Sequence, residues 1–189
     1  MIAAAKRIAL SLLPARLTDF ARDRRGVSAV EFAIMLPLML TIYLGTEEVA
    51  QGVGAHRKVT LTARAVADLT AQASNLDNAG MNNVLNASAA ILAPYPVSKA
   101  KITVSLIKID GNGIAKIEWS DTKNGTARAK GSVVTVPSAF VVNNTSLIWG
   151  EVEYAYTPTI GYVISGTMNL KDQIYMRPRL TDTVTRSNS

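Results

Sequence analysis

The 189-residue sequence contains no cysteine and only one histidine, His56. The first absence excludes disulfides, thiolate metal sites and cysteine nucleophiles. His56 stands beside Arg57 and Lys58 without a nucleophile motif, so it indicates neither a metal centre nor a Ser–His–Asp triad. We expect it to be exposed to water or to lipid headgroups. The sequence therefore predicts no catalytic residue, cofactor or metal, and it favours a protein that is not an enzyme.

Acidic residues are scarce at the N-terminus, where the positive charge of the chain is concentrated. The formal net charge is +6, of which residues 1–26 supply +4 from six Lys/Arg and two Asp. The remaining residues are nearly neutral. Because binding to phosphate backbones depends on a basic surface, this distribution argues against a nucleic-acid partner.

Charged residues are also missing from a long apolar run, Val27 to Gly45, in which Glu31 is the one exception. As an α-helix these 19 residues would be about 28 Å long, close to the roughly 30 Å hydrocarbon core of a bilayer. The sequence predicts a transmembrane helix over residues 27–46. The basic residues in front of it predict a cytoplasmic N-terminus and a C-terminal domain on the outer side.

Residues 1–26 are predicted to be a basic leader, weakly amphipathic and able to lie on the membrane surface. A secretory signal peptide is the competing interpretation. Its apolar core would extend only from Ile8 to Leu13 before Pro14, and no small-x-small cleavage site follows. The pattern therefore favours a leader of another kind.

Glu31 is the residue that makes the apolar run unusual. A carboxylate in hydrocarbon costs several kcal/mol unless it is paired, shallow or protonated, so such a residue is a functional candidate by default. The alternative is that Glu31 lies at headgroup depth and is merely tolerated there.

The sequence around Glu31 resembles the processing site of type IV prepilins, in which basic residues precede a glycine, four residues, a glutamate and an aromatic residue. The resemblance implies that a prepilin peptidase cuts between Gly26 and Val27, so that Glu31 and Phe32 become the fifth and sixth residues of the mature chain. It also implies peptidase recognition through Gly26, Val27 and Glu31. Subunit assembly would use Val27, Glu31 and Phe32, with the new Val27 ammonium group pairing with the acid of a neighbouring subunit.

Within that superfamily the sequence is similar to the TadE/TadG family of minor pilin-like proteins. The similarity is carried by the run from Asp23 to Ala33, by the apolar segment after it, and by Gly45 followed by Glu47 and Glu48. Weaker blocks follow around Arg57, Ala63–Leu69, Trp119 and Tyr175–Arg179. The resemblance implies a component of the tight-adherence (Flp) pilus in the bacterial inner membrane, with a periplasmic C-terminal domain. Its partners would be a prepilin peptidase, pilin subunits and other Tad/Flp assembly proteins.

Two other interpretations remain open. The chain could be an uncleaved single-pass protein whose outer domain binds pilus components or the cell wall. It could also be a membrane-tethered enzyme, which would require a deep pocket in the outer domain lined by two or more acids. Glu47 and Glu48 do not supply such a pair, because adjacent helical residues point about 100° apart. We interpret them as marking the exit from the membrane, with a subunit contact as the alternative.

An apolar stripe predicts that the helix continues beyond the membrane over residues 47–76. Its members recur every three or four positions: Val59, Thr62, Val66, Leu69, Ala73 and Leu76. One helix from Val27 to about Ser74 would resemble a pilin stem. A joint at Gly52–Gly54 is the alternative, and Pro37 removes one hydrogen bond where it could bend the membrane part.

Residues 77–180 are predicted to form an outer α+β domain, in which the long N-terminal helix packs on a small antiparallel sheet. A turn at 75–80 and a helix from Met81 to Leu92 come first. Alternation then predicts a strand over 102–109, with a phase slip that indicates a bulge or a two-sided strand. A hairpin turn at Asp110–Gly113, favoured over a calcium loop, leads into a strand over 114–119. Further strands are expected at 132–136, 147–156 and 174–177, and residues 181–189 are expected to be a frayed polar tail.

Overall fold

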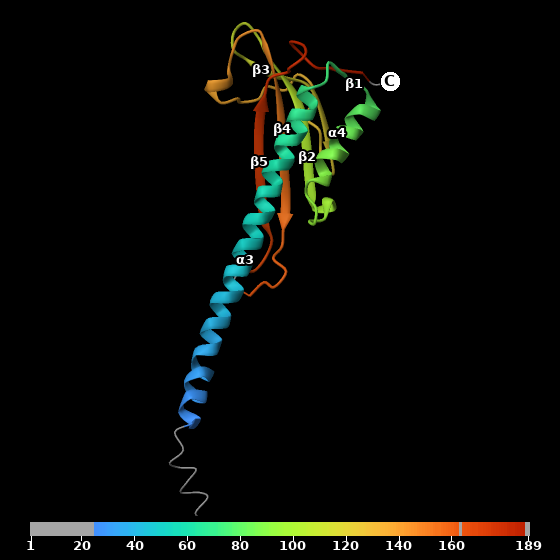
Figure 1. Cartoon of the computed structure of the whole chain (residues 1–189). Coiled ribbons are helices and arrows are strands. Elements are labelled where there is room, and N and C mark those ends of the chain that lie inside the picture. Colours follow the sequence, from blue (N-terminus) through green and yellow to red (C-terminus); the bar gives the residue numbers. More distant parts are fainter. Residues whose placement is uncertain (1–24, 163, 188–189) are drawn as a thin grey trace, which may run out of the picture. The chain divides into compact units, whose positions relative to one another are not determined.

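The computed structural model describes residues 25–162 and 164–187 (Figure 1). The chain divides into two units between Thr46 and Glu47. Helix α3, Arg25–Ala71, belongs to both and contains Gly52 and Gly54 as helical residues. It matches the predicted long helix closely, and it shows no break at the two glycines. Of the predicted basic leader, residues 1–26, positions 1–24 lie outside the described residues, and Arg25 and Gly26 begin α3.

The part of α3 in the second unit is helical because good helix formers flank its few glycines, and it buries one stripe of small side chains. The stripe consists of Ala55, Val59, Ala63, Val66, Ala67 and Ala71. Thr62 is also buried and donates its hydroxyl to the carbonyl of Lys58 at 2.8 Å. The prediction was wrong for Leu69, which is exposed, because Thr70 and Ala71 occupy the inward face there. Small residues let the helix axis approach the sheet closely.

The sheet of the second unit has four antiparallel strands in the order β3-β2-β4-β5. Their bounds are Ala100–Ile109 for β2, Ala115–Lys123 for β3, Thr145–Tyr156 for β4 and Met168–Met176 for β5. The end of α3 and the short helix α4 cover one face of this sheet and share one hydrophobic core with it (Figure 1). The predicted α+β arrangement, with a helix packed on an antiparallel sheet, is confirmed.

The phase slip predicted in β2 has two structural expressions. The register between β2 and β3 shifts after Leu106, which pairs with Trp119, whereas Ile107 pairs with Ile117. Glu118 is therefore the additional residue of a bulge on β3. Strand β2 is also buried on both sides: Leu106 faces the helices, and Ile107 belongs to a second core on the opposite face. Both possible meanings of the slip are thus correct.

Two strand predictions need correction. Residues 132–136 form no strand, and Val133 makes only an isolated bridge to Lys116, because Pro137 and Gly131 close the segment on both sides. Strand β5 begins at Met168 and not at Ile174, since its early residues pair with the end of β4. Two 3₁₀ turns, η1 at Val97–Lys99 and η2 at Ser138–Phe140, complete the connections.

Helix α4, Asn78–Ala90, begins three residues earlier than predicted. Asp77 is its N-cap, and the Asp77 carboxylate accepts a hydrogen bond from the backbone N–H of Gly80 at 2.6 Å. A capping acid satisfies an otherwise unpaired donor and favours the positive end of the helix dipole. Met81, Leu85 and Ser88 are buried on one face, as their spacing predicted.

Residues 184–187 of the C-terminal segment pair and pack with the second unit, so the expected fraying is wrong for this part of the tail. Strand β6, Thr185–Arg186, pairs in parallel with β1, Asn75–Leu76. The Val184 side chain is fully buried in the main core, and its carbonyl accepts a hydrogen bond from the Trp119 indole at 2.8 Å.

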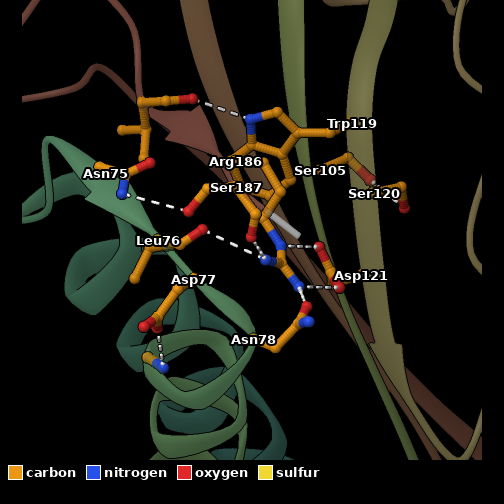
Figure 2. Close-up of polar contacts among 12 residues, drawn as sticks. Asn75, Leu76, Asp77, Asn78, Ser105, Trp119, Ser120, Asp121, Arg186 and Ser187 are labelled. Atoms are coloured by element: carbon orange, nitrogen blue, oxygen red, sulfur yellow. Dashed lines mark hydrogen bonds and ion pairs between the residues drawn. The ribbon is translucent and has the colours of Figure 1, made fainter. Parts of the chain in front are cut away.

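Arg186 fixes this tail to three elements (Figure 2). Its guanidinium donates to both carboxylate oxygens of Asp121 at 3.0 and 3.2 Å, to the Asn78 side chain at 2.7 Å and to the Leu76 carbonyl at 3.2 Å. The Arg186 side chain is only 11% exposed. A planar fork of donors can satisfy several acceptors at once, which makes this arginine a cross-link between β3, α4 and β1.

Candidate functional site

The first unit presents an uncovered apolar helix. Every large apolar side chain described between Val27 and Tyr43 is exposed, including Phe32. The helix is long and apolar enough to cross a membrane, and none of its most apolar 18-residue window is buried within the protein. Because exposed contiguous apolar surface of this extent is unfavourable in water, the segment is suited to a lipid environment.

Two threonine hydroxyls near the C-terminal end of this segment are satisfied by the helix itself. Thr41 donates to the carbonyl of Pro37 at 2.9 Å, and Thr46 donates to the carbonyl of Ile42 at 2.8 Å. Such i−4 bonds remove the cost of placing a hydroxyl in hydrocarbon.

Glu31 is the one acidic side chain in the apolar run. Its side chain is exposed, and it makes no hydrogen bond or ion pair with any residue that the structure describes. Val27 lies four residues earlier on the same helix, and therefore on the same face one turn away. The arrangement leaves a carboxylate on an apolar surface with its acceptor oxygens open to a group from another molecule.

Gly26 and Val27 are both exposed, and nothing in the structure lies within 4 Å of the position that a Cβ atom on Gly26 would take. The residues that the sequence analysis identified as site candidates thus lie together on one exposed stretch of α3: Gly26, Val27, Glu31 and Phe32. The roles of these four residues in processing and in subunit assembly stay predictions.

The sequence reasoning missed the role of Glu48. Its side chain is 1% exposed, and its two oxygens accept hydrogen bonds from the backbone N–H groups of Tyr162 at 2.5 Å and Ile164 at 2.8 Å. The signal was present: the stripe through Val59 and Ala55, continued backwards by seven residues, reaches Glu48. Glu48 is therefore an inward residue that holds the β4–β5 loop.

Glu47, the neighbour of Glu48, is exposed and accepts a hydrogen bond from the Gln51 side chain at 3.0 Å. The two acids point in different directions and do not form an acid–base pair, as predicted. His56 is exposed, also as predicted.

The segment Asp110–Gly113 is a hairpin turn, as predicted. The Asp110 carboxylate accepts from the backbone N–H groups of Asn112 and Ile114, both at 2.9 Å. The hydrogen bond from Ile114 is the main cause that holds the pKa of Asp110 below its ordinary value. Among the described residues no group of three or more His, Asp or Glu is placed to hold a metal ion.

The outer face of the sheet carries a cluster that sequence reasoning did not identify. The Arg128 guanidinium lies 4.0 Å above the Trp149 ring and binds both carboxylate oxygens of Glu151. Trp149 stacks on Tyr175 with ring centroids 5.6 Å apart and donates its indole N–H to Gln173 at 3.0 Å. Trp149 is only 8% exposed, so the cluster is closely packed and leaves little of the ring open to a ligand.

Two acids on β4, Glu151 and Glu153, line a surface depression of about 390 Å³. Burial raises the pKa of Glu151 against the opposing effect of Arg128. The hydrogen bond from Lys171, at 2.5 Å, lowers the pKa of Glu153. Each carboxylate is thus engaged by a cation of this chain, which does not match the pair of available acids that a membrane-tethered enzyme would need.

A long helix whose C-terminal half packs on a four-stranded antiparallel sheet defines a pilin-like α+β protein. Comparison with protein families makes the class more specific: residues 26–68 match the family described as TadE-like protein. That region of the chain is a TadE-like domain, which confirms the resemblance seen at Gly26–Phe32 and Ala63–Leu69. The match covers less than a quarter of the chain and leaves the weaker blocks near Trp119 and Tyr175 as predictions.

Searches of curated proteins and of solved structures found no match for the chain.

Proposed function

We propose that this protein is a minor pilin-like component, a pseudopilin, needed to assemble a tight-adherence type IV pilus and processed by a prepilin peptidase. Membership of residues 26–68 in the TadE-like family suggests a protein associated with the Tad pilus, and TadE-like proteins are not known as enzymes. The partners would be the prepilin peptidase, pilin subunits and other Tad/Flp assembly proteins.

The observation that carries the proposal is the placement of one unpaired acid on an exposed apolar helix. Glu31 has no partner among the described residues and lies on the helix five residues after Gly26, where the family match begins. A plain membrane anchor gains nothing from a carboxylate at this position. Pairing with a cation from a neighbouring subunit would give this acid a role.

Processing would supply that cation. Cleavage between Gly26 and Val27 removes the basic leader and creates an ammonium group on Val27. When the helices of two subunits associate in lipid, the Val27 ammonium of one can pair with Glu31 of the other. Breaking a buried ion pair by removing one partner costs about 3–5 kcal/mol, so the pairing would strongly favour a correctly staggered neighbour.

The proposed location is the bacterial inner membrane, crossed once by residues 27–46. The basic leader would face the cytoplasm and the folded second unit the periplasm, because basic flanks are retained on the cytoplasmic side.

The mature N-terminus tests the proposal. Intact mass of the full-length product, expressed with and without the prepilin peptidase, should show loss of residues 1–26 only when the peptidase is present. Gly26→Val should block the loss, and Gly45→Val is the matched control because it makes the same change away from the predicted cut. A chain that keeps Met1 in peptidase-containing cells would contradict processing and favour the uncleaved single-pass protein.

A further inference from the structure

The loop between β4 and β5, residues 157–167, is the part of the second unit that the proposed function does not explain. It contains Thr, Pro, Ile, Gly, Tyr, Val and Ser, and it has no charged residue. The loop that follows β3 differs, because residues 124–130 include Arg128 and Lys130. A loop in water has no reason to avoid charge, so the composition of this uncharged loop points to a different surrounding.

The uncharged loop is fastened to α3 by Glu48. The backbone N–H of Tyr162 donates to one oxygen of the Glu48 carboxylate and that of Ile164 to the other, at 2.5 and 2.8 Å. Figure 1 shows the loop beside α3, at the end of β4 and β5 where the helix enters the second unit. Hydrogen bonds to an ionised acceptor are stronger than neutral ones, so the loop is held firmly at this point of the chain.

Chain connectivity then limits how far the loop can be from the membrane. Glu48 follows Gly45, the last residue of the apolar run, by three residues. Three residues span at most about 11 Å even when fully extended. The polar headgroup layer on each side of the hydrocarbon is roughly 5–8 Å thick, since the whole bilayer measures about 40–45 Å against a 30 Å core. This limit holds for any direction of the membrane-spanning segment relative to the folded unit.

Two large side chains of the loop are exposed. Tyr162 is 61% exposed and Ile160 is 46% exposed. Tyrosine is enriched at membrane–water interfaces, where its ring contacts acyl chains and its hydroxyl stays among polar headgroups.

We infer that the uncharged loop is a second membrane contact of this protein, in which Ile160 and Tyr162 enter the lipid headgroup layer and Glu48 fixes the depth of the loop. The inference rests on the proposed function in one respect, the membrane-spanning role of residues 27–46. The contact would set the tilt and height of the folded unit above the bilayer before the protein is assembled with its partners.

The absence of cysteine makes the inference directly testable. Single Ile160→Cys and Tyr162→Cys variants of the full chain would carry a nitroxide label in phosphatidylethanolamine/phosphatidylglycerol vesicles. Depth follows from the relative accessibility of the label to oxygen, which concentrates in lipid, and to a water-soluble nickel chelate. Val142→Cys is the matched control, because Val142 is 42% exposed and precedes β4, whereas Ile160 follows it. The twelve residues of β4 separate the two sites by roughly 36 Å. A label at Tyr43→Cys, within the predicted membrane span, serves as the reference for a position in the hydrocarbon core.

We expect the labels at 160 and 162 to lose nickel accessibility relative to the label at 142, and to report a depth between those at 142 and 43. Adding Glu48→Ala should restore nickel accessibility at 160, whereas Glu47→Ala should not. Labels at 160 and 162 that are as accessible to nickel as the label at 142, with position 43 in hydrocarbon, would overturn the loop contact alone. A label at 43 that reports water would overturn both this inference and the proposed membrane span.

Discussion

Gly150 on β4 lies directly beneath the backbone carbonyl of Ala63 on α3. A Cβ atom on Gly150 would come within 2.7 Å of that oxygen and within 3.0 Å of Ala67 and Val66. The glycine therefore permits the close approach of helix and sheet that the small-residue stripe of α3 prepares. The packing of α3 on the sheet within the second unit depends on this contact.

Gly150→Ala should destabilise the protein by about 1–3 kcal/mol, because the clashing atom is backbone and cannot rotate away. Gly52→Ala is the matched control. A Cβ there would make only ordinary 3.8 Å contacts, and alanine is favoured over glycine in a helix by about 0.5–1 kcal/mol. Denaturant unfolding of the full chain in detergent measures both variants, and equal stability of the two would contradict the close-packing argument.

Glu48→Ala should release the β4–β5 loop and destabilise the second unit by about 1–3 kcal/mol, since two backbone donors lose a charged acceptor. Hydrogen exchange at the Tyr162 and Ile164 amides should accelerate. Glu47→Ala, which removes an exposed acid one position away, should leave both amides protected. Unchanged exchange in the Glu48 variant would show that the loop is held by other contacts.

Arg186→Ala should cost about 1–3 kcal/mol, because Asp121, Asn78 and the Leu76 carbonyl lose a shared donor. Arg186→Lys should recover only part of the loss, since an ammonium cannot bind Asp121 through two parallel hydrogen bonds. Arg177→Ala is the control, because Arg177 is exposed and its loss changes the net charge by the same amount. If Arg177→Ala is equally harmful, the effect is one of net charge and not of the tail cross-link.

The two glutamates on the outer face of β4 should titrate on opposite sides of the ordinary value of 4.5. The pKa of Glu153 is lowered by the hydrogen bond from Lys171, so its contribution to stability is present above 4.5 and is lost as pH falls through its folded pKa. Burial raises the pKa of Glu151, so its contribution grows as pH falls from its folded pKa to 4.5. NMR titration of the two carboxyl carbons measures the order, and Glu153 titrating above Glu151 would contradict it.

Local patterns made much of the fold predictable. The stripe through Val59 and Val66 predicted the buried face of α3, and the alternation in residues 147–156 predicted β4, because one-sided burial leaves a clear period. The turn at Asp110–Gly113 was predictable because aspartate, asparagine and glycine are favoured in hairpin turns.

Long-range contacts were not predictable in the same way. Strand β6 is two residues long and pairs in parallel with β1, so it has no local period that could predict it. The carbonyl of Val184 accepts a hydrogen bond from an indole 65 residues away, which no local pattern indicates. Glu48 was misjudged because a charge beside an apolar run suggests exposure. Its burial depends on two backbone donors in a loop more than 110 residues later.

The number of pili on cells that carry the Glu31→Ala variant tests most directly the central claim, that Glu31 pairs with a neighbouring subunit during assembly. Cells that lack the native gene would be complemented with the wild type, with Glu31→Ala or with Glu47→Ala, and surface pili would be counted at equal protein levels. Loss of a buried partner worth about 3–5 kcal/mol corresponds to on the order of a hundredfold or more weaker association. We predict that Glu31→Ala cells are almost without pili and that Glu47→Ala cells match the wild type. Normal pili in the Glu31→Ala cells would contradict the pilin-like role and leave residues 27–46 as a simple membrane anchor.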